Sequence, residues 1–273
     1  MRRALLAACA LASLLPLDVA APVWHAASSS ADISSNWAGY AASGGAFTSV
    51  TGSWTVPHMS ANGNAGVDAT WVGIGGVSSH DLIQAGTQET MSRSGQVAYE
   101  AWVEMLPQSS RRVPLAVNAG DSMTVSVTQT SSGQWQLSLK DDTTGQTYQT
   151  TAQYQSALSS AEWIEEAPSG PGGELPLDNF GTVQFSGASA VKNGQTVTIA
   201  QANGQPITLA SRGQTLASPS ALGADGASFS VTRASSSANP PSPSPRPEPG
   251  RPPFRRRPRI EIERVPRPWL FNF

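Results

Sequence analysis

Apolar and polar residues alternate strictly in many short segments of this chain, and turn residues separate the segments. Because successive side chains of a β-strand point to opposite faces, a period of two predicts strands that are buried on one side. The pattern runs from Ser34 to Arg233 and predicts about a dozen strands in an antiparallel β-sandwich or barrel. The alternating residues include Val50, Trp54 and Val56; Val97, Tyr99, Ala101, Val103 and Met105; Met123, Val125 and Val127; Trp135, Leu137 and Leu139; Val183 and Phe185; Val197 and Ile199; and Phe229 and Val231.

Turns and one helix interrupt this pattern. Residues 141–145 read Asp-Asp-Thr-Thr-Gly, and Asn203 is followed by Gly204, so both places predict hairpin turns. Only residues 155–161 suggest a short helix. The sequence contains no internal repeat.

Composition supports the all-β interpretation. Charged residues make up only 13% of the chain, against a usual share of about 25%. Lys140 and Lys192 are the only lysines. Such a chain lacks the Glu, Lys and Leu spacing of a coiled coil or long-helix protein, and it is typical of secreted β proteins.

Charge and composition divide the chain into three parts: a secretory signal and its flank at 1–27, a β-sandwich domain at 28–234 and a basic tail at 235–273. Residues 31–234 hold 7 Lys and Arg against 15 Asp and Glu, and residues 235–273 hold 8 Arg against 3 Glu. The near-neutral total of -2 therefore describes neither part.

The first residues have the pattern of a secretory signal. Two arginines precede an apolar run from Ala4 to Leu15, and Val19-Ala20-Ala21 offers small residues for cleavage. Cys9 is the only cysteine, so the mature protein would lack thiols and disulfides. Residues 6–9 also resemble a lipoprotein cleavage box, but the apolar run before them is short. We therefore expect a secreted, extracellular protein.

The tail is rich in Ser, Pro and Arg, which predicts an extended or disordered segment. Its Arg255-Arg256-Arg257 run offers a contact to an anionic surface such as lipid or cell-wall polymer. A solvated extension without a partner is the alternative. We expect no nucleic acid as a partner.

Metal and histidine chemistry have little support. The sequence has no cysteine pair and no H-E-x-x-H motif, so we expect no metal and no cofactor. His80 beside Ser78 and Ser79 is the one nominal base for a serine nucleophile, and no G-x-S-x-G turn accompanies it. An exposed loop histidine is the better interpretation.

Carboxylates and a carboxamide remain as catalytic groups. A carboxyl beside Trp or Ile on a strand is a candidate for burial and for proton exchange with water. A neighbouring carboxamide can donate a hydrogen bond to a developing oxyanion. A polar outer sheet face is the alternative. Period two places three sets of residues on common faces: Glu100, Trp102 and Glu104; Glu162, Ile164 and Glu166; and Leu82, Gln84 and Gln88.

Six segments, in order, resemble the glutamic peptidases, also called eqolisins, over roughly Ser34 to Arg233. The segments are Ser35-Asn36-Trp37-Ala38-Gly39-Tyr40; Val50-Thr51-Gly52-Ser53-Trp54-Thr55-Val56-Pro57; Trp71-Val72-Gly73-Ile74; Leu82-Ile83-Gln84-Ala85-Gly86; Tyr99 to Glu104; and Ala161-Glu162-Trp163-Ile164-Glu165-Glu166, followed by Phe180-Gly181-Thr182-Val183.

The resemblance implies an antiparallel β-sandwich of two seven-stranded sheets, a concanavalin-like jelly roll with a substrate groove. It implies an acid endopeptidase that cleaves polypeptides without metal and is insensitive to pepstatin. We expect a monomer. Gln84 and Glu162 would form the catalytic dyad, and Trp37 and Trp71 would line the groove. Glu166 is the rival of Glu162, but four strand residues separate the two by about 13 Å.

The chain departs from the family at Gly75, where fungal members usually have an aspartate near the groove. It also lacks their cysteines after the signal, and few residues separate the signal from Ser34. The basic tail could replace a pro-segment by lying on the acidic body.

Two other functions remain open at this point. A glycan-active sandwich could use Glu162 with Glu166, or Glu100 with Glu104, as acid and nucleophile. A non-catalytic glycan- or wall-binding module is the second. Exchanging Gln84 for Ala separates the peptidase from the glycan-active enzyme, which gives Gln84 no required role.

Overall fold

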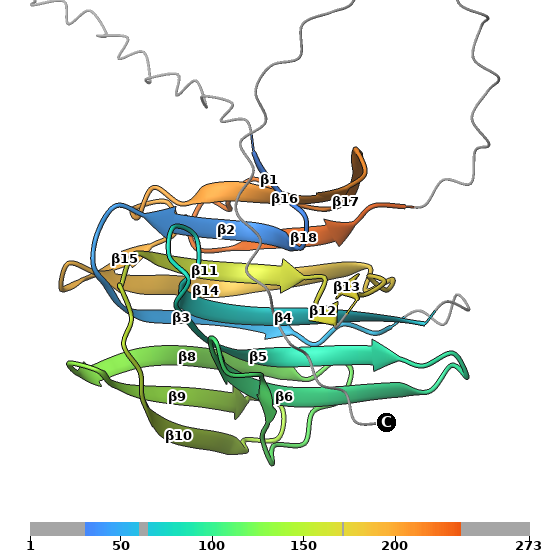
Figure 1. Ribbon diagram of the computed structural model, residues 1–273, viewed down its shortest axis with the longest axis horizontal. Coiled ribbons are helices and arrows are strands. Elements are labelled where there is room, and N and C mark those ends of the chain that lie inside the picture. Colours follow the sequence, from blue (N-terminus) through green and yellow to red (C-terminus); the bar gives the residue numbers. More distant parts are fainter. Residues whose placement is uncertain (1–30, 60–64, 171, 236–273) are drawn as a thin grey trace, which may run out of the picture.

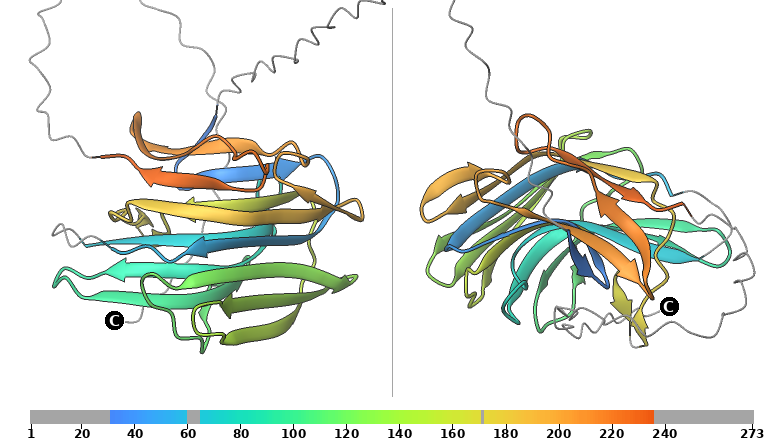
Figure 2. Two further views of the ribbon diagram at one scale, coloured as in Figure 1. Left: turned by 180° about the vertical axis from the view of Figure 1, so that it is seen from behind. Right: turned by 90° about the horizontal axis from the view of Figure 1, so that it is seen from above.

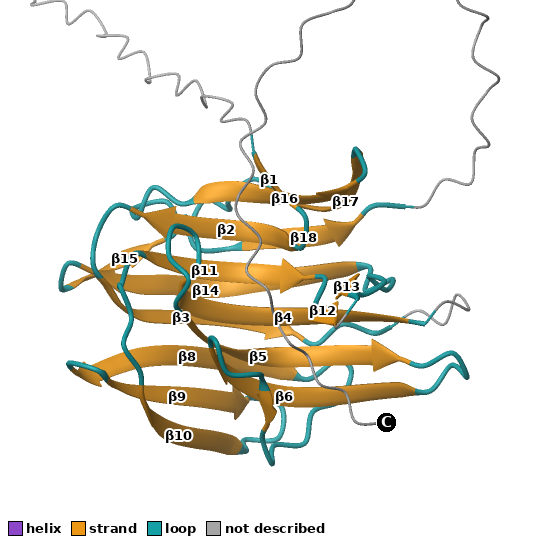
Figure 3. Ribbon diagram, viewed as in Figure 1, coloured by secondary structure: helices purple, strands orange, loops and turns teal. Residues whose placement is uncertain are grey.

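The computed structural model describes residues 31–59, 65–170 and 172–235 (Figure 1). These residues form strands joined by loops, with no helix (Figure 3). Within them, accordingly, no helix is long and apolar enough to cross a membrane. The signal and its flank at 1–27, with Cys9, lie outside the described residues, as does the tail from 236, with its arginine run.

Six strands form a front layer in the order β2-β11-β4-β5-β6-β7, with antiparallel neighbours (Figure 1). Period-two alternation gives each long strand two distinct faces. The strands are β2 (Trp37–Ser43), β11 (Ser160–Glu166), β4 (Gly66–Gly75), β5 (Leu82–Met91), β6 (Val97–Met105) and β7 (Arg111–Arg112).

Six other strands form a back layer in the order β10-β9-β8-β3-β14-β18, seen from behind in Figure 2. β3 packs over β4 and β11, and β8 packs over β4 and β5. The strands are β10 (Thr147–Gln153), β9 (Gln134–Asp141), β8 (Ser122–Ser131), β3 (Phe47–Thr55), β14 (Thr182–Lys192) and β18 (Phe229–Arg233).

Hydrogen bonds connect the two layers at one edge. β16 (Gln205–Ser211) pairs with β2, β17 (Gln214–Pro219) pairs with β18, and the two strands pair with each other. The ladder is thus one continuous 16-stranded sheet that folds over itself. The predicted all-β antiparallel class is confirmed, whereas a division into two seven-stranded sheets is not. The remaining strands are β1 (Asp32–Ser34), parallel to β16; β15 (Gln195–Thr198), beside β14; and the small pair β12 (Ser169–Gly170) and β13 (Gly173–Glu174).

The main core lies between the layers, where the alternating apolar residues meet. We call these facing sides the inner faces and the opposite side of the front layer the outer face. Aromatic rings join the layers: Phe229 lies 4.8 Å from Tyr40 of β2 and stacks at 4.6 Å on Phe185 of β14. Burying such rings removes large apolar areas from water and holds the folded-over sheet closed.

Two local predictions from the sequence need correction. Residues 155–161 are not helical, because Leu158 has a φ of 55° and β11 begins at Ser160. Asn203 does lie in a turn with φ 59°, but the strands around it pair with β14 and β2 rather than with each other. The turn at 141–145 does close the hairpin of β9 and β10.

Candidate active site

A second apolar cluster covers the outer face of the front layer. It is separate from the main core and is rich in tryptophan. Outer-face positions are alternate residues of each strand, as the period of two predicts. The cluster contains Trp37, Ala41, Ala69, Trp71, Leu82, Trp102, Leu106, Ile164 and Ile207.

Glu162 and Gln84 lie in one row across this outer face. Strand register pairs Glu162 of β11 with Gly73 of β4, and Gly73 with Gln84 of β5. Strands are about 4.8 Å apart, so the two Cα atoms are roughly 10 Å apart with a glycine between them. Both side chains are buried. Gly73 contributes no side chain, so none stands between Glu162 and Gln84 in this row.

Glu104 of β6 continues the row. It pairs with Gln84 in the strand register, and the Gln84 Nε2 atom donates a hydrogen bond to Oε2 of Glu104. Oε1 of Gln84 is buried and has no hydrogen-bond partner among the described residues. A buried acceptor of this kind requires a donor, such as water or a ligand, to satisfy it.

Glu166 lies on the same face as Glu162, as predicted, but in another row and with a different role. It pairs with Trp37 and Ala69 in the strand register. Its Oε2 accepts a hydrogen bond from the Trp71 Nε1 atom at 2.7 Å, and its Oε1 accepts one from Asn36 Nδ2 at 3.1 Å. Glu166 therefore holds an indole in place.

The two predicted groove tryptophans lie together beside this row. Their rings meet edge to face, with centroids 5.1 Å apart and an interplanar angle of 77°. A Cβ at Gly73 would lie 2.9 Å from Cζ3 of Trp71, so the indole extends over the glycine. Trp71 thus forms an apolar wall beside Gly73, between Glu162 and Gln84 in the row.

Gly75 ends β4 near this site and has a φ of 98°. A Cβ there would lie 2.3 Å from the carbonyl oxygen of Asp81. Any larger residue would meet both a strained backbone and a steric clash. The backbone of this chain therefore does not accommodate the aspartate that the family resemblance leads one to expect at this position.

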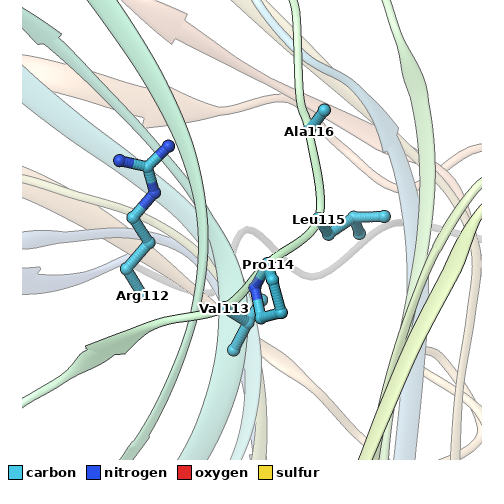
Figure 4. Close-up of a pocket in the computed structure, with 5 residues that line it drawn as sticks. All are labelled: Arg112, Val113, Pro114, Leu115 and Ala116. Atoms are coloured by element: carbon cyan, nitrogen blue, oxygen red, sulfur yellow. The ribbon is translucent and has the colours of Figure 1, made fainter.

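The other carboxyl groups singled out from the sequence are engaged elsewhere. Glu100 forms an ion pair with Arg112, with Oε1 and Nη1 3.0 Å apart at the partly exposed edge of the layer. Arg112 also borders a surface concavity with Val113, Pro114, Leu115 and Ala116 (Figure 4). This concavity includes neither Gln84 nor Glu162.

Four buried carboxyl groups on the inner face escaped the sequence reasoning: Asp68, Glu89, Glu165 and Asp178. The sequence carried a usable signal for two of them. Glu89 shares the parity of Ile83 and Ala85, and Glu165 shares that of Ala161 and Trp163. An acidic residue on the apolar parity of a strand indicates burial in the core.

The fold and the outer-face row define a class: an all-β protein with a buried glutamate and a buried glutamine in one row of a sheet face. Comparison with known proteins agrees. The model of the peptidase A4 family matches residues 35–232. The chain belongs to this family. Its relatives and its structural neighbours are glutamic peptidases, which are hydrolases.

Relatives and solved structures extend this result. The chain is 30% identical to aspergillopepsin-2 of Aspergillus niger over 190 residues, covering 61% of this chain and 67% of the relative. It is 31% identical to scytalidopepsin B of Scytalidium lignicola over 193 residues, covering 66% and 72%. The crystal structure of scytalido-glutamic peptidase with a transition-state analogue inhibitor matches with a TM-score of 0.64 at 26% identity, covering 73% of this chain and 98% of that one.

Proposed function

We propose that this protein is an acid endopeptidase in which Glu162 and Gln84 act together on a water molecule and a peptide bond. The proposal is supported by the outer-face row, in which only Gly73 stands between Glu162 and Gln84. In this row, Oε1 of Gln84 is buried and has no hydrogen-bond donor among the described residues. Structures of relatives with a peptide-based transition-state analogue and with the tripeptide Ala-Ile-His support a polypeptide substrate.

The proposed reaction begins with Glu162 as carboxylate. It removes a proton from the water while the water oxygen bonds to the carbonyl carbon, and the carbonyl electron pair moves onto oxygen. The Gln84 Oε1 atom orients the water, and an Nε2 hydrogen stabilises the oxyanion. Glu162 then gives its proton to the amide nitrogen, the C–N bond breaks, and the amine leaves.

Each carboxyl pair that a glycan-active enzyme would use contains a member that is bound to another residue. Glu166, the proposed partner of Glu162, already accepts hydrogen bonds from Trp71 and Asn36. Glu100, the proposed partner of Glu104, forms an ion pair with Arg112. No observation in the described residues favours that function over peptide hydrolysis.

The test is digestion of a denatured protein at about pH 3.5 in the presence of pepstatin and EDTA. We expect the wild type to cleave it and Glu162→Gln to lose roughly 10²–10⁴-fold in kcat. Glu174→Gln, at an exposed glutamate, serves as the matched control. An inactive folded wild type, or an active Glu162→Gln variant, would contradict the proposal.

Export belongs to the same proposal, because residues 1–21 have the charged start, apolar run and small residues of a secretory signal. Expression of the full chain should yield a processed protein in the medium. The new N-terminus, read by Edman degradation or mass spectrometry, checks this, and an unprocessed protein retained in the cell would contradict it.

A further inference from the structure

We propose that Glu104 is a positioning residue that sets the orientation of the Gln84 carboxamide. This inference rests on the proposed function of Gln84. Glu104 is 1% exposed and lies directly beside Gln84 in the register of β5 and β6. The Gln84 Nε2 atom donates to Oε2 of Glu104. A buried carboxylate in this place binds one end of the carboxamide and not the other.

A hydrogen bond is needed for this selection because the two ends of a carboxamide have nearly the same shape. Packing alone does not distinguish Oε1 from Nε2. When it is ionised, the Glu104 carboxyl only accepts hydrogen bonds, so it then holds Nε2 and turns Oε1 away from itself. Oε1 is the atom left without a partner in the described residues. Nε2 also carries a second hydrogen, since a carboxamide nitrogen has two.

The chemical consequence concerns the transition state more than substrate binding. With Nε2 held, Oε1 is oriented to accept a hydrogen bond from the attacking water, and the second N–H is oriented toward the oxyanion. If the carboxamide rotated by 180°, the acceptor and donor would exchange places. Both interactions strengthen during reaction, so their loss lowers kcat more than it changes KM.

The experiment compares Glu104→Leu, Glu104→Gln and Glu100→Leu in the acid digestion assay. Glu100 is the matched control because it lies on the same strand and face but pairs with Arg112. We expect Glu104→Leu to lose roughly 10²-fold in kcat with KM little changed. We expect Glu104→Gln, which can still accept through Oε1, to recover part of the loss, and Glu100→Leu to resemble wild type.

A second readout uses a peptide-based transition-state analogue, which Glu104→Leu should bind more weakly while its thermal unfolding stays close to wild type. Equal kcat in Glu104→Leu and wild type, or equal losses in Glu104→Leu and Glu100→Leu, would overturn the positioning role. Gln84→Ala separates this failure from that of the proposed function. If Gln84→Ala remains active, the Gln84 role itself is wrong.

A different observation carries a second inference. We infer that the four inner-face carboxyl groups share protons and thereby make the fold stable in acid and unstable as the pH rises. We call Asp68, Glu89, Glu165 and Asp178 the inner carboxyl cluster. Asp68 of β4 and Glu89 of β5 face each other in the strand register, and Glu165 of β11 pairs with Thr70. The bridge between Val67 and Leu177 brings Asp178 to the same place.

Cations do not neutralise this cluster. Neither ion pair in the described part of the chain includes any of its members. Arg233 is the cation that faces it, but its Nε donates to the backbone oxygen of Asp178 at 2.9 Å and its Nη1 to that of Leu216 at 2.7 Å. Burying several uncompensated negative charges is costly, so protons must replace the missing cations.

Hydrogen-bond donors around the cluster compensate its negative charges only in part. Thr70 Oγ1 donates to Oε2 of Glu165 at 2.6 Å. Tyr99 of β6 is another titratable group near the cluster, and the charge of Glu166, on the opposite face of β11, also raises the pKa of Glu165. The described residues hold no arrangement of His, Cys, Asp and Glu suited to a metal ion.

Burial is the main cause that raises the pKa values of all four groups. It raises the pKa of Glu165 to about 8 and that of Asp178 to about 6. Burial and the neighbouring carboxylates also hold the pKa values of Asp68 and Glu89 well above their ordinary range. A raised pKa in the fold gives stability that is complete below the unfolded value of about 4 and is lost as the pH rises through 6 and 8.

Thermal unfolding between about pH 4 and pH 8 tests this inference. We expect the wild-type melting temperature to fall steadily, and Glu165→Gln and Asp68→Asn to flatten that fall and melt at least about 5 °C higher at the upper pH. The glutamine can still accept from Thr70, which protects the fold. Glu174→Gln is the exposed control. A parallel fall in wild type and both variants, or stabilisation of the wild type by added Ca²⁺ at the upper pH, would overturn the inference.

Discussion

The outer and inner faces of the same front strands both bury carboxyl groups, yet the groups that hydrogen-bond to these carboxyls differ between the two faces. Glu165 and Glu166 are adjacent and fully buried, and their side chains point to opposite faces. Glu166 accepts hydrogen bonds from the N–H groups of Trp71 and Asn36. Glu165 has a threonine hydroxyl and other carboxyl groups around it. Two carboxyl groups that are equally buried therefore differ in the groups that hydrogen-bond to them.

Neighbouring strands repeat the contrast. On β5, Gln84 on the outer face donates to Glu104, whereas Glu89 on the inner face lies opposite Asp68. On the outer face, Glu166 and Glu104 each accept a hydrogen bond from a nitrogen donor, which fixes the orientation of these two carboxyl groups. The inner face groups carboxyls together, which links their protonation to the stability of the whole fold.

The largest effect on activity should come from adding a side chain at Gly73, which lies between Glu162 and Gln84 in the outer row. Gly73→Ala would place a Cβ 2.9 Å from Trp71, 3.0 Å from Leu82 and 3.1 Å from Gln84, so these side chains beside the proposed reaction centre would have to shift. We expect kcat/KM to fall about 10²-fold and the free energy of unfolding to fall by about 1–3 kcal/mol. Steady-state kinetics and denaturant unfolding measure the two effects.

Gly172→Ala is the control for this substitution, because no atom lies within 4 Å of the added methyl group. A Gly73→Ala variant that matched Gly172→Ala in activity would show that the space between Glu162 and Gln84 has no catalytic importance.

A smaller effect should follow removal of one nitrogen donor from the outer face. Trp71→Phe deletes the N–H that Glu166 accepts and leaves the aromatic ring. We expect kcat/KM to fall about 10-fold, equivalent to one buried hydrogen bond of about 1–3 kcal/mol. Trp54→Phe deletes an inner-face N–H bonded to Thr87 and should reduce stability without changing the acid activity. Equal activity losses in the two variants would remove the distinction between the faces.

The smallest effect should come from the inner hydroxyl donor. Thr70→Val removes the hydrogen bond to Glu165, which favours the ionised form and lowers the pKa of that carboxyl. We expect the free energy of unfolding to fall by about 1–3 kcal/mol above pH 8 and by less in acid, where the carboxyl is protonated. Thr215→Val, at an exposed strand position, is the control. A loss independent of pH would argue against a charged Glu165 in the fold.

Much of the fold was predictable because a strand pattern is local. The period of two correctly placed Glu162, Ile164 and Glu166 on one face and identified the antiparallel class. The helix expected at 155–161 was wrong, since Leu158 has a positive φ and β11, which begins at Ser160, pairs with β2 and β4 from distant parts of the sequence. The continuous 16-stranded ladder could not be predicted from local patterns either. It depends on the pairing of β16 with β2, which are far apart in the sequence, together with that of β17 with β18.

The sequence by itself determined the strand faces, the acidic body and the order of motifs that the peptidase A4 family shares, because each depends on neighbouring residues. Only the tertiary structure decided which faces meet and which strands lie side by side. Strand pairing places Gly73 between Glu162 and Gln84. It also brings Glu166 within hydrogen-bonding distance of Trp71, and Glu104 within that of Gln84. On the inner face it brings together the members of the inner carboxyl cluster. Strand register joins residues distant in the chain, and the low dielectric of the interior then fixes how their charges interact.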